Sequence, residues 1–205
     1  MTFSVFSRRQ VLQVVSGFVA ASAKGSIPLV ANLIADSTLN SPAQAQISGR
    51  VCLPLESGSI ISLECLGDKL GPRYLDGRTK DGTVGLAPSF GGMYTGTKWR
   101  VDRRQSTSVG IYYTFYCLGD IPGSNYLDGR TIDGTVGLAH SYGEGRYTGA
   151  RWRVYTDGNS YSLYCLGSVN GPKWLDGRTG DGTVGLAPSV EERYTGTKWK
   201  LTYQG

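Results

Sequence analysis

The 205-residue sequence has a single histidine and only 18% charged residues, and each scarcity excludes a class of protein. With His140 alone, the chain cannot build a histidine-rich zinc site, and any Ser-His-Asp triad would need this one residue. The low charge, beside 40% hydrophobic residues, is unlike a disordered chain. No nucleophile and base stand at a recognisable spacing. We therefore expect a folded protein that is not an enzyme and holds no metal or other cofactor.

The first 45 residues lack tyrosine, tryptophan and cysteine and contain one acid. They include SRRQVL at 7–12, an apolar run that Lys24 interrupts after 13 residues, and AQA at 43–45. The run is shorter than the about 18 residues that cross a membrane. The segment resembles a bacterial twin-arginine export signal with its cleavage site, and an uncleaved membrane anchor is the alternative. We expect 1–45 to be removed, the rest to be exported to the periplasm or the extracellular space, and no membrane span to remain.

No strong charge follows that segment. The chain has 21 bases and 16 acids, of which three bases and one acid lie in the first 45 residues, leaving 18 against 15, a net +3. This charge is small and interspersed, so we expect no nucleic-acid partner.

Glycine is abundant: 30 residues, about twice ordinary usage, indicate many tight turns and therefore many short strands.

An internal repeat fills the chain after Ser57. YLDGRTKDGTVGLAPS at 74–89 returns as YLDGRTIDGTVGLAHS at 126–141 and WLDGRTGDGTVGLAPS at 174–189. Each block is preceded by Cys-Leu-Gly and followed by Tyr-Thr-Gly and a tryptophan. No linker separates the copies, which predicts one domain over 46–205. The three copies cover about 57–105, 106–157 and 158–205.

Each copy contains four strand candidates, twelve in all. In the first copy, apolar and polar residues alternate in ISLEC at 61–65, which predicts a strand with one buried face. Two further strands, over 73–79 and 83–89, are joined at Asp81-Gly82, a dipeptide typical of a two-residue hairpin turn. The fourth candidate covers 97–101 and carries the tryptophan.

The order of motifs in a copy is Leu-Asp, then Gly-Thr-Val-x-Leu, then a tryptophan two positions after a polar residue. From about Ser57 to Tyr203 this order resembles the repeat of ricin-type β-trefoil domains. The resemblance implies an all-β fold in which six strands close a short barrel capped by three hairpins, and it implies carbohydrate binding. It favours a trefoil over a β-prism, and three copies are too few to close a propeller.

In ricin-type repeats, an aspartate after the apolar residue of the second strand bonds sugar hydroxyls. The matching positions are Asp76, Asp128 and Asp176. The family's aromatic platform for the sugar ring aligns with Ala87, Ala139 and Ala187. The aromatic residues Tyr142 and Trp174 are candidate replacements if their rings are exposed. A structural interpretation also stays open, because an Asp and an Arg two residues apart in a hairpin can bond each other and the loop.

Three cysteines, Cys65, Cys117 and Cys165, stand at equivalent positions and would face one another around a threefold axis if all point inward. Three thiols without a histidine fall short of the four ligands of structural zinc, so we expect small buried residues. A disulfide between Cys52 and one of them stays open.

Two functions fit the sequence. The first is a secreted, non-enzymatic, lectin-like module with three related glycan sites that act together through avidity. The second is a protein-binding trefoil, such as a protease inhibitor or an adhesion factor, that acts through loops differing between copies. These loops are 91–93, 143–146 and 191–193. Nothing in the sequence indicates the oligomeric state.

Overall fold

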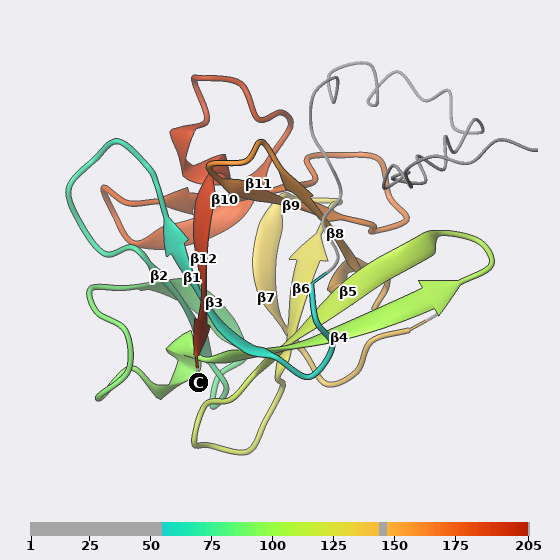
Figure 1. Cartoon of the computed structure of the whole chain (residues 1–205), viewed down its shortest axis with the longest axis horizontal. Coiled ribbons are helices and arrows are strands. Elements are labelled where there is room, and N and C mark those ends of the chain that lie inside the picture. Colours follow the sequence, from blue (N-terminus) through green and yellow to red (C-terminus); the bar gives the residue numbers. More distant parts are fainter. Residues whose placement is uncertain (1–54, 144–146, 205) are drawn as a thin grey trace, which may run out of the picture. The chain divides into compact units, whose positions relative to one another are not determined.

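The computed structural model describes residues 55–143 and 147–204, and this part of the chain is all-β (Figure 1). The export signal expected at 1–45 and Cys52 lie outside the described residues. Within them, no helix has the length and apolar character to cross a membrane. The strands are β1 (Ile60–Cys65), β2 (Tyr74–Arg78), β3 (Thr83–Ala87), β4 (Trp99–Ser106), β5 (Gly110–Cys117), β6 (Tyr126–Arg130), β7 (Thr135–Ala139), β8 (Trp152–Thr156), β9 (Tyr161–Cys165), β10 (Trp174–Arg178), β11 (Thr183–Ala187) and β12 (Trp199–Gln204).

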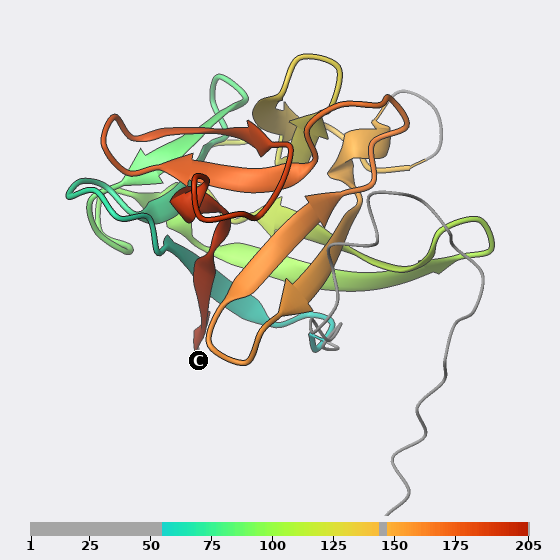
Figure 2. The same cartoon turned by 90° about the horizontal axis from the view of Figure 1, so that it is seen from above.

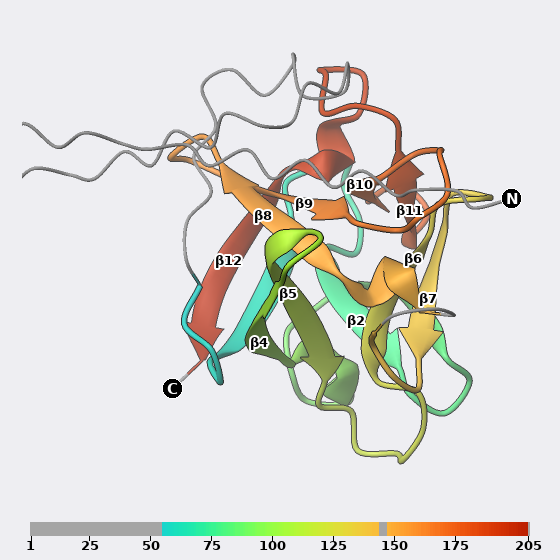
Figure 3. The same cartoon turned by 90° about the vertical axis from the view of Figure 1, so that its right-hand side faces the viewer.

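Six strands join in a closed cycle of antiparallel pairings. β1 pairs with β12 and β4, β5 pairs with β4 and β8, and β9 pairs with β8 and β12. Figure 3 shows β1 and β12 lying side by side, although they come from opposite ends of the repeat region. A closed cycle leaves no free edge along it, so the sheet forms an antiparallel barrel. The all-β prediction is confirmed.

The other six strands form three hairpins, β2–β3, β6–β7 and β10–β11. These hairpins meet one another, because β3, β7 and β11 also pair among themselves. A single 3-10 turn follows each hairpin and packs on its first strand. The turns are η2 (Thr95–Thr97), η3 (Thr148–Ala150) and η4 (Thr195–Thr197). Each copy of the repeat therefore supplies two barrel strands, one hairpin and one 3-10 turn.

The inward faces of the barrel strands build the core. Ile61, Leu63 and Cys65 are completely buried, as the alternation at 61–65 predicts. Each copy also buries one tryptophan, whose indole N–H donates a hydrogen bond to a backbone carbonyl of the hairpin in the same copy. The pairs are Trp99 with Leu75 (2.9 Å), Trp152 with Leu127 (2.9 Å) and Trp199 with Leu175 (3.1 Å). These bonds anchor each hairpin to the barrel.

The hairpin turn at Asp81-Gly82 is longer than the two-residue turn expected. Arg78 pairs with Thr83, so the loop holds the four residues 79–82. The Arg78 carbonyl accepts hydrogen bonds from the N–H groups of both Asp81 (3.3 Å) and Gly82 (2.9 Å), and Gly82 takes the left-handed conformation at φ +73°. The carboxylate of Asp81 accepts from the backbone N–H (3.0 Å) and hydroxyl (2.6 Å) of Thr83, which favours this wider loop.

The three buried cysteines do not meet at one point. Each thiol donates hydrogen bonds to two backbone carbonyls, one from a hairpin and one from a 3-10 turn, and each cysteine uses a different hairpin. The carbonyls belong to Gly177 and Gly196 for Cys65, Gly77 and Gly96 for Cys117, and Gly129 and Gly149 for Cys165. Burial raises the pKa of all three thiols to about 11. All three are free.

The β4–β5 hairpin departs from the threefold pattern. Both of its strands have eight residues, against five in β8 and β9, and the hairpin projects from the barrel (Figures 1 and 2). The strand expected over 97–101 begins at Trp99 and continues to Ser106, because the polar residues that follow it pair in register with β5. Gly110, at φ +72°, begins β5 after the turn.

Candidate functional site

The three aspartates predicted to bond sugar occupy the middle position of the first strand of each hairpin. They are Asp76 in β2, Asp128 in β6 and Asp176 in β10. Asp76 and Asp176 are only 8% exposed. Among the described residues no hydrogen bond reaches these carboxylates, and the closest cation is Arg178, whose Nε lies 4.0 Å from Asp176. We refer to them below as the inner acids.

Burial is the main influence on the inner acids. It raises the pKa of all three carboxyl groups, and the arginine two residues later opposes the shift. A carboxylate offers about four acceptor positions, and none of the described residues donates a hydrogen bond to those of the inner acids. Each hairpin thus presents a partly dehydrated acceptor that a ligand hydroxyl can satisfy.

The glycine of each Tyr-Thr-Gly motif packs directly against an inner acid. A Cβ atom at Gly196 would stand 2.6 Å from Oδ1 of Asp176 and would collide with the backbone of Gly177. Gly96 and Gly149 have the same environment in their copies. Only glycine fits at this position. The close contact places the 3-10 turn, and the tyrosine that precedes it, near the acid.

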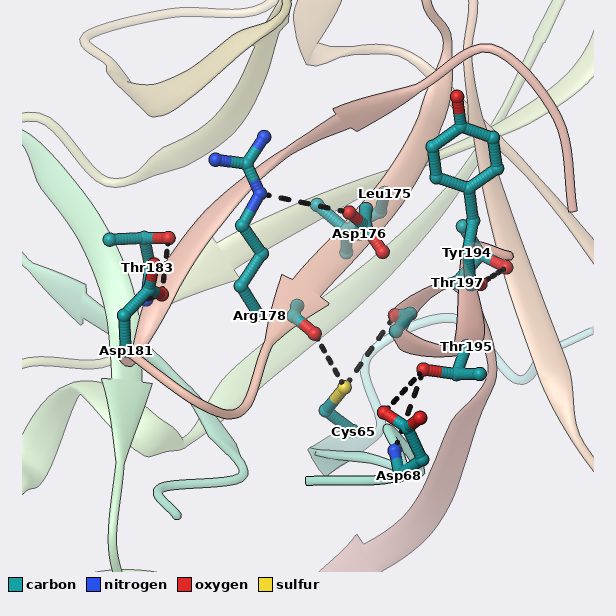
Figure 4. Close-up of polar contacts among 12 residues, drawn as sticks. Cys65, Asp68, Leu175, Asp176, Arg178, Asp181, Thr183, Tyr194, Thr195 and Thr197 are labelled. Carbon is teal, nitrogen blue, oxygen red and sulfur yellow. Dashed lines mark hydrogen bonds and ion pairs between the residues drawn. The ribbon is translucent and has the colours of Figure 1, made fainter. Parts of the chain in front are cut away.

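In the third copy, the inner acid lines a cavity of about 720 Å³. Asp176 and Arg178 from β10 share this cavity with Tyr194 and Thr195 at η4, and with Asp68 from the loop after β1 (Figure 4). The Thr195 hydroxyl donates to the Asp68 carboxylate at 3.0 Å. Arg193 lies 4.9 Å from the centre of the Tyr194 ring in a cation–π contact. The cavity therefore joins the third copy to the first.

The first copy has a smaller version of this site, with a volume of about 190 Å³. Its lining includes Asp76, Arg78 and Tyr94 of the first copy and Asp120 and Ile121 of the second. The threonine of the 3-10 turn again reaches the next copy: Asp120 donates its N–H to Thr95 (3.4 Å), and Ser168 donates its N–H to Thr148 (3.2 Å). Because Asp68, Asp120 and Ser168 hold equivalent positions, the three sites share one construction but differ in charge.

In the first and third copies, the aromatic residue that shares a cavity with the inner acid is the tyrosine of Tyr-Thr-Gly, which sequence reasoning missed. Tyr94, Tyr147 and Tyr194 are all partly exposed. The motif stands in all three copies, a short loop after the hairpin. This repetition is the sequence signal that could have indicated the tyrosines. The alanines aligned with the family platform are buried, at 1–2% exposure.

The two replacement platforms considered from the sequence line neither cavity. Trp174 is 6% exposed, and its ring centre lies 4.9 Å from that of Tyr164 and 5.6 Å from that of Tyr155. Tyr142 packs against Tyr126, with ring centres 4.9 Å apart. Both rings belong to aromatic clusters on the outer side of the barrel strands.

No protein-family model matches the chain, and no curated protein matches its sequence. Solved structures with a similar fold include Cry35Ab1, with a TM-score of 0.53 and 16% identity over 73% of this chain and 36% of that one. Another is the Polyporus squamosus lectin bound to the human-type influenza-binding epitope Neu5Acα2-6Galβ1-4GlcNAc, with a TM-score of 0.51 and 13% identity over 73% of this chain and 50% of the lectin. This chain spans half or less of each. At such identities the likeness concerns the fold alone.

Proposed function

We propose that this protein is a non-enzymatic carbohydrate-binding module built on a ricin-type β-trefoil. The trefoil assignment is supported by the closed cycle of six strands and by three hairpins that pair with one another, one hairpin from each copy. The similarity of the fold to that of the Polyporus squamosus lectin supports it as well. The strand pairing repeats with the sequence copies, as a duplicated threefold domain requires.

The observation that carries the proposal is the third-copy cavity. Asp176 presents a buried carboxylate without a hydrogen bond from the described residues, next to the Arg178 guanidinium and the Tyr194 ring. Sugar hydroxyls donate to carboxylates and accept from guanidinium groups, while the apolar face of a pyranose packs on an aromatic ring. A cavity of about 720 Å³ lies within the usual range of about 300–1,000 Å³ for ligand sites. We therefore take this site as the principal one and the first-copy site as a weaker relative.

A glycan array probed with the full-length protein tests the proposal and identifies the ligand. Isothermal titration then measures affinity for the best glycan with the native protein and with the Asp176→Asn variant. We expect Asp176→Asn to remove the strongest binding class, since charge-assisted hydrogen bonds contribute roughly 1.5–3 kcal/mol each. A blank array at high protein density, with no heat of binding against cell-wall and exopolysaccharide fractions, would overturn the proposal.

We further propose export by the twin-arginine route. The three free thiols suit a domain that folds in a reducing compartment before it leaves the cytoplasm. Replacing Arg8 and Arg9 by lysine should retain the protein in the cytoplasm of a bacterial host with that pathway. Fractionation and mass measurement of the mature N-terminus check this, and export of the Lys-Lys variant at the native level would contradict it.

One observation favours the protein-binding alternative. Met93, in the variable loop of the first copy, is 85% exposed, so a protein partner can reach this apolar side chain. If this loop captures a protein, exchanging 91–93 for the corresponding residues of the third copy should abolish capture from a host envelope extract. The glycan proposal expects the same exchange to leave binding at the third-copy cavity unchanged.

A further inference from the structure

The second copy buries a cation where the other two copies expose one. Arg151 precedes the core tryptophan and is 8% exposed, whereas the equivalent Lys98 and Lys198 are exposed. Its Nε donates to the backbone carbonyl of Thr148 at 3.4 Å, and in the described part of the chain no carboxylate forms an ion pair with it. The rest of the guanidinium borders the neighbouring cavity, where an anion can reach it.

Arg151 lines a cavity of about 290 Å³. The other described residues that line it are polar or small, and none of these is acidic: Gln105, Ser106, Thr107, Tyr112 and Gly143. An amide and hydroxyl groups therefore surround the guanidinium, and all of them can donate hydrogen bonds. Among its described lining residues, Arg151 alone is charged.

The extension of the β4–β5 hairpin builds this cavity. Gln105 and Tyr112 belong to the part of the hairpin that exceeds the five-residue length of β8 and β9. The tip of the hairpin is bonded to β8, because the Arg153 guanidinium donates a hydrogen bond to the backbone carbonyl of Val109 at 2.9 Å. The site is thus a feature of one copy, held by a contact between β8 and the tip.

We propose that this cavity binds an oxyanion, with Arg151 as its principal contact. The planar guanidinium fork matches carboxylate, phosphate and sulfate groups, to which it can donate two parallel hydrogen bonds. The volume lies just below the usual range of ligand cavities, so it suits one small ligand: an acidic monosaccharide or a free inorganic oxyanion. The inner acids take no part, so this site is independent of the proposed glycan sites.

The test is a titration of the full-length protein with glucuronate, inorganic phosphate or glucose at constant ionic strength, followed by NMR. We expect saturable binding of the oxyanions and none of glucose. Arg151→Lys and Arg151→Gln should each weaken it by at least roughly tenfold, since lysine lacks the fork and glutamine the charge. Glucuronate binding tighter than phosphate identifies an acidic sugar as the ligand, and the reverse order identifies an inorganic anion.

The controls are Lys98→Gln and Lys198→Gln, which remove a charge at the equivalent exposed positions and should leave the affinity unchanged. Arg151→Lys should fold, because lysine stands at this position in both other copies. Tyr112→Phe removes one hydroxyl from the lining and should weaken binding without moving the melting temperature. Native affinity in the two Arg151 variants, equal losses in the lysine controls, or no saturable binding would each overturn the proposal.

Discussion

Each hairpin carries two aspartates five residues apart, and the two have opposite environments. Two of the inner acids, Asp76 and Asp176, are buried and Asp128 is partly buried. None accepts a hydrogen bond from the described residues, and desolvation raises the pKa of each. The second set, Asp81, Asp133 and Asp181, we call the turn acids. Each turn acid is exposed and accepts hydrogen bonds from the backbone and hydroxyl of a threonine, which lower its pKa.

The contrast distinguishes an aspartate with a structural role from one that we propose binds a ligand, although the repeated sequence shows no such difference. Both sets are identical in all three copies. A turn acid has local hydrogen-bond partners that explain its presence, whereas for an inner acid the cost of desolvation exceeds the favourable effect of the neighbouring arginine. Residues that lower stability and still stand in every copy are expected at functional sites.

The largest expected effect comes from replacing one whole set by asparagine. The triple variant of the inner acids should lose all glycan binding and keep its fold, because each site loses its charged acceptor. The triple variant of the turn acids should keep glycan binding and melt at a lower temperature, since each of the three loops loses the charge on the acceptor of two hydrogen bonds. Titration calorimetry and thermal unfolding of both variants check this. If the inner variant melts lower and binds normally, the roles are reversed.

The next largest effect concerns the glycine behind an inner acid. Gly196→Ala should lower the free energy of unfolding by about 3 kcal/mol, because its Cβ meets the Gly177 backbone, which cannot move aside. The matched control in the same copy is Gly180→Ala, whose Cβ contacts only the flexible Lys69 side chain. Urea unfolding measures both. Equal stability of the two variants would show that the close packing at Asp176 is not required.

The two sets of acids should also differ in their pH dependence. The folded-state pKa of the inner acids lies above the ordinary value of 3.8, so their favourable contribution exists at lower pH and is lost as pH rises through the raised pKa. The turn acids have a folded-state pKa below 3.8, so they stabilise above that value and lose the contribution as pH falls through the lowered pKa.

Unfolding measured across this range checks the assignment. The stability of the inner-acid triple variant, relative to the native protein, should increase as pH rises above 3.8. The relative stability of the turn-acid variant should change below 3.8 and decrease as pH rises. Parallel curves for the two variants would contradict the assigned environments.

The smallest expected effect is that of the aromatic ring beside an inner acid. Tyr194→Ala should weaken glycan binding at the third-copy cavity, since aromatic packing contributes about 0.5–1.5 kcal/mol beyond the area buried. Tyr194→Phe keeps the ring and should retain most of the affinity. Trp174→Phe is the control, because Trp174 lies outside the cavity in a packed cluster. Affinity unchanged in Tyr194→Ala would exclude the ring from the site.

The repeat made most of the fold predictable. Alternation in ISLEC at 61–65 fixed the buried face, and three nearly identical blocks implied three equivalent hairpins. Two features were not predictable from local patterns. The turn at Asp81-Gly82 is wider than predicted because a hydrogen bond between the Asp81 side chain and Thr83 competes with the two-residue turn. Strand β4 extends to Ser106 because its polar residues pair with β5 across the hairpin.

Less of the candidate site was predictable. The inner acids were named from the family resemblance, and their role remains a prediction. The tyrosines of Tyr-Thr-Gly were overlooked because they lie some 18 residues after the inner acid in sequence, and only the fold brings Tyr94 and Tyr194 into a cavity with it. The contribution of the next copy, such as Asp68 beside Thr195, depends on the closed barrel and has no local signal.

The central claim is that the inner acids, and not the turn acids, bind the ligand. Carboxyl-carbon NMR of the full-length protein, with the six hairpin aspartates assigned, measures this directly as the array-selected glycan is added. We predict saturable shifts for the carboxyl carbon of Asp176, with smaller shifts for Asp76 and Asp128, and none for Asp81, Asp133 and Asp181. Shifts confined to the turn acids, or saturated binding with no movement of any inner acid, would contradict the claim.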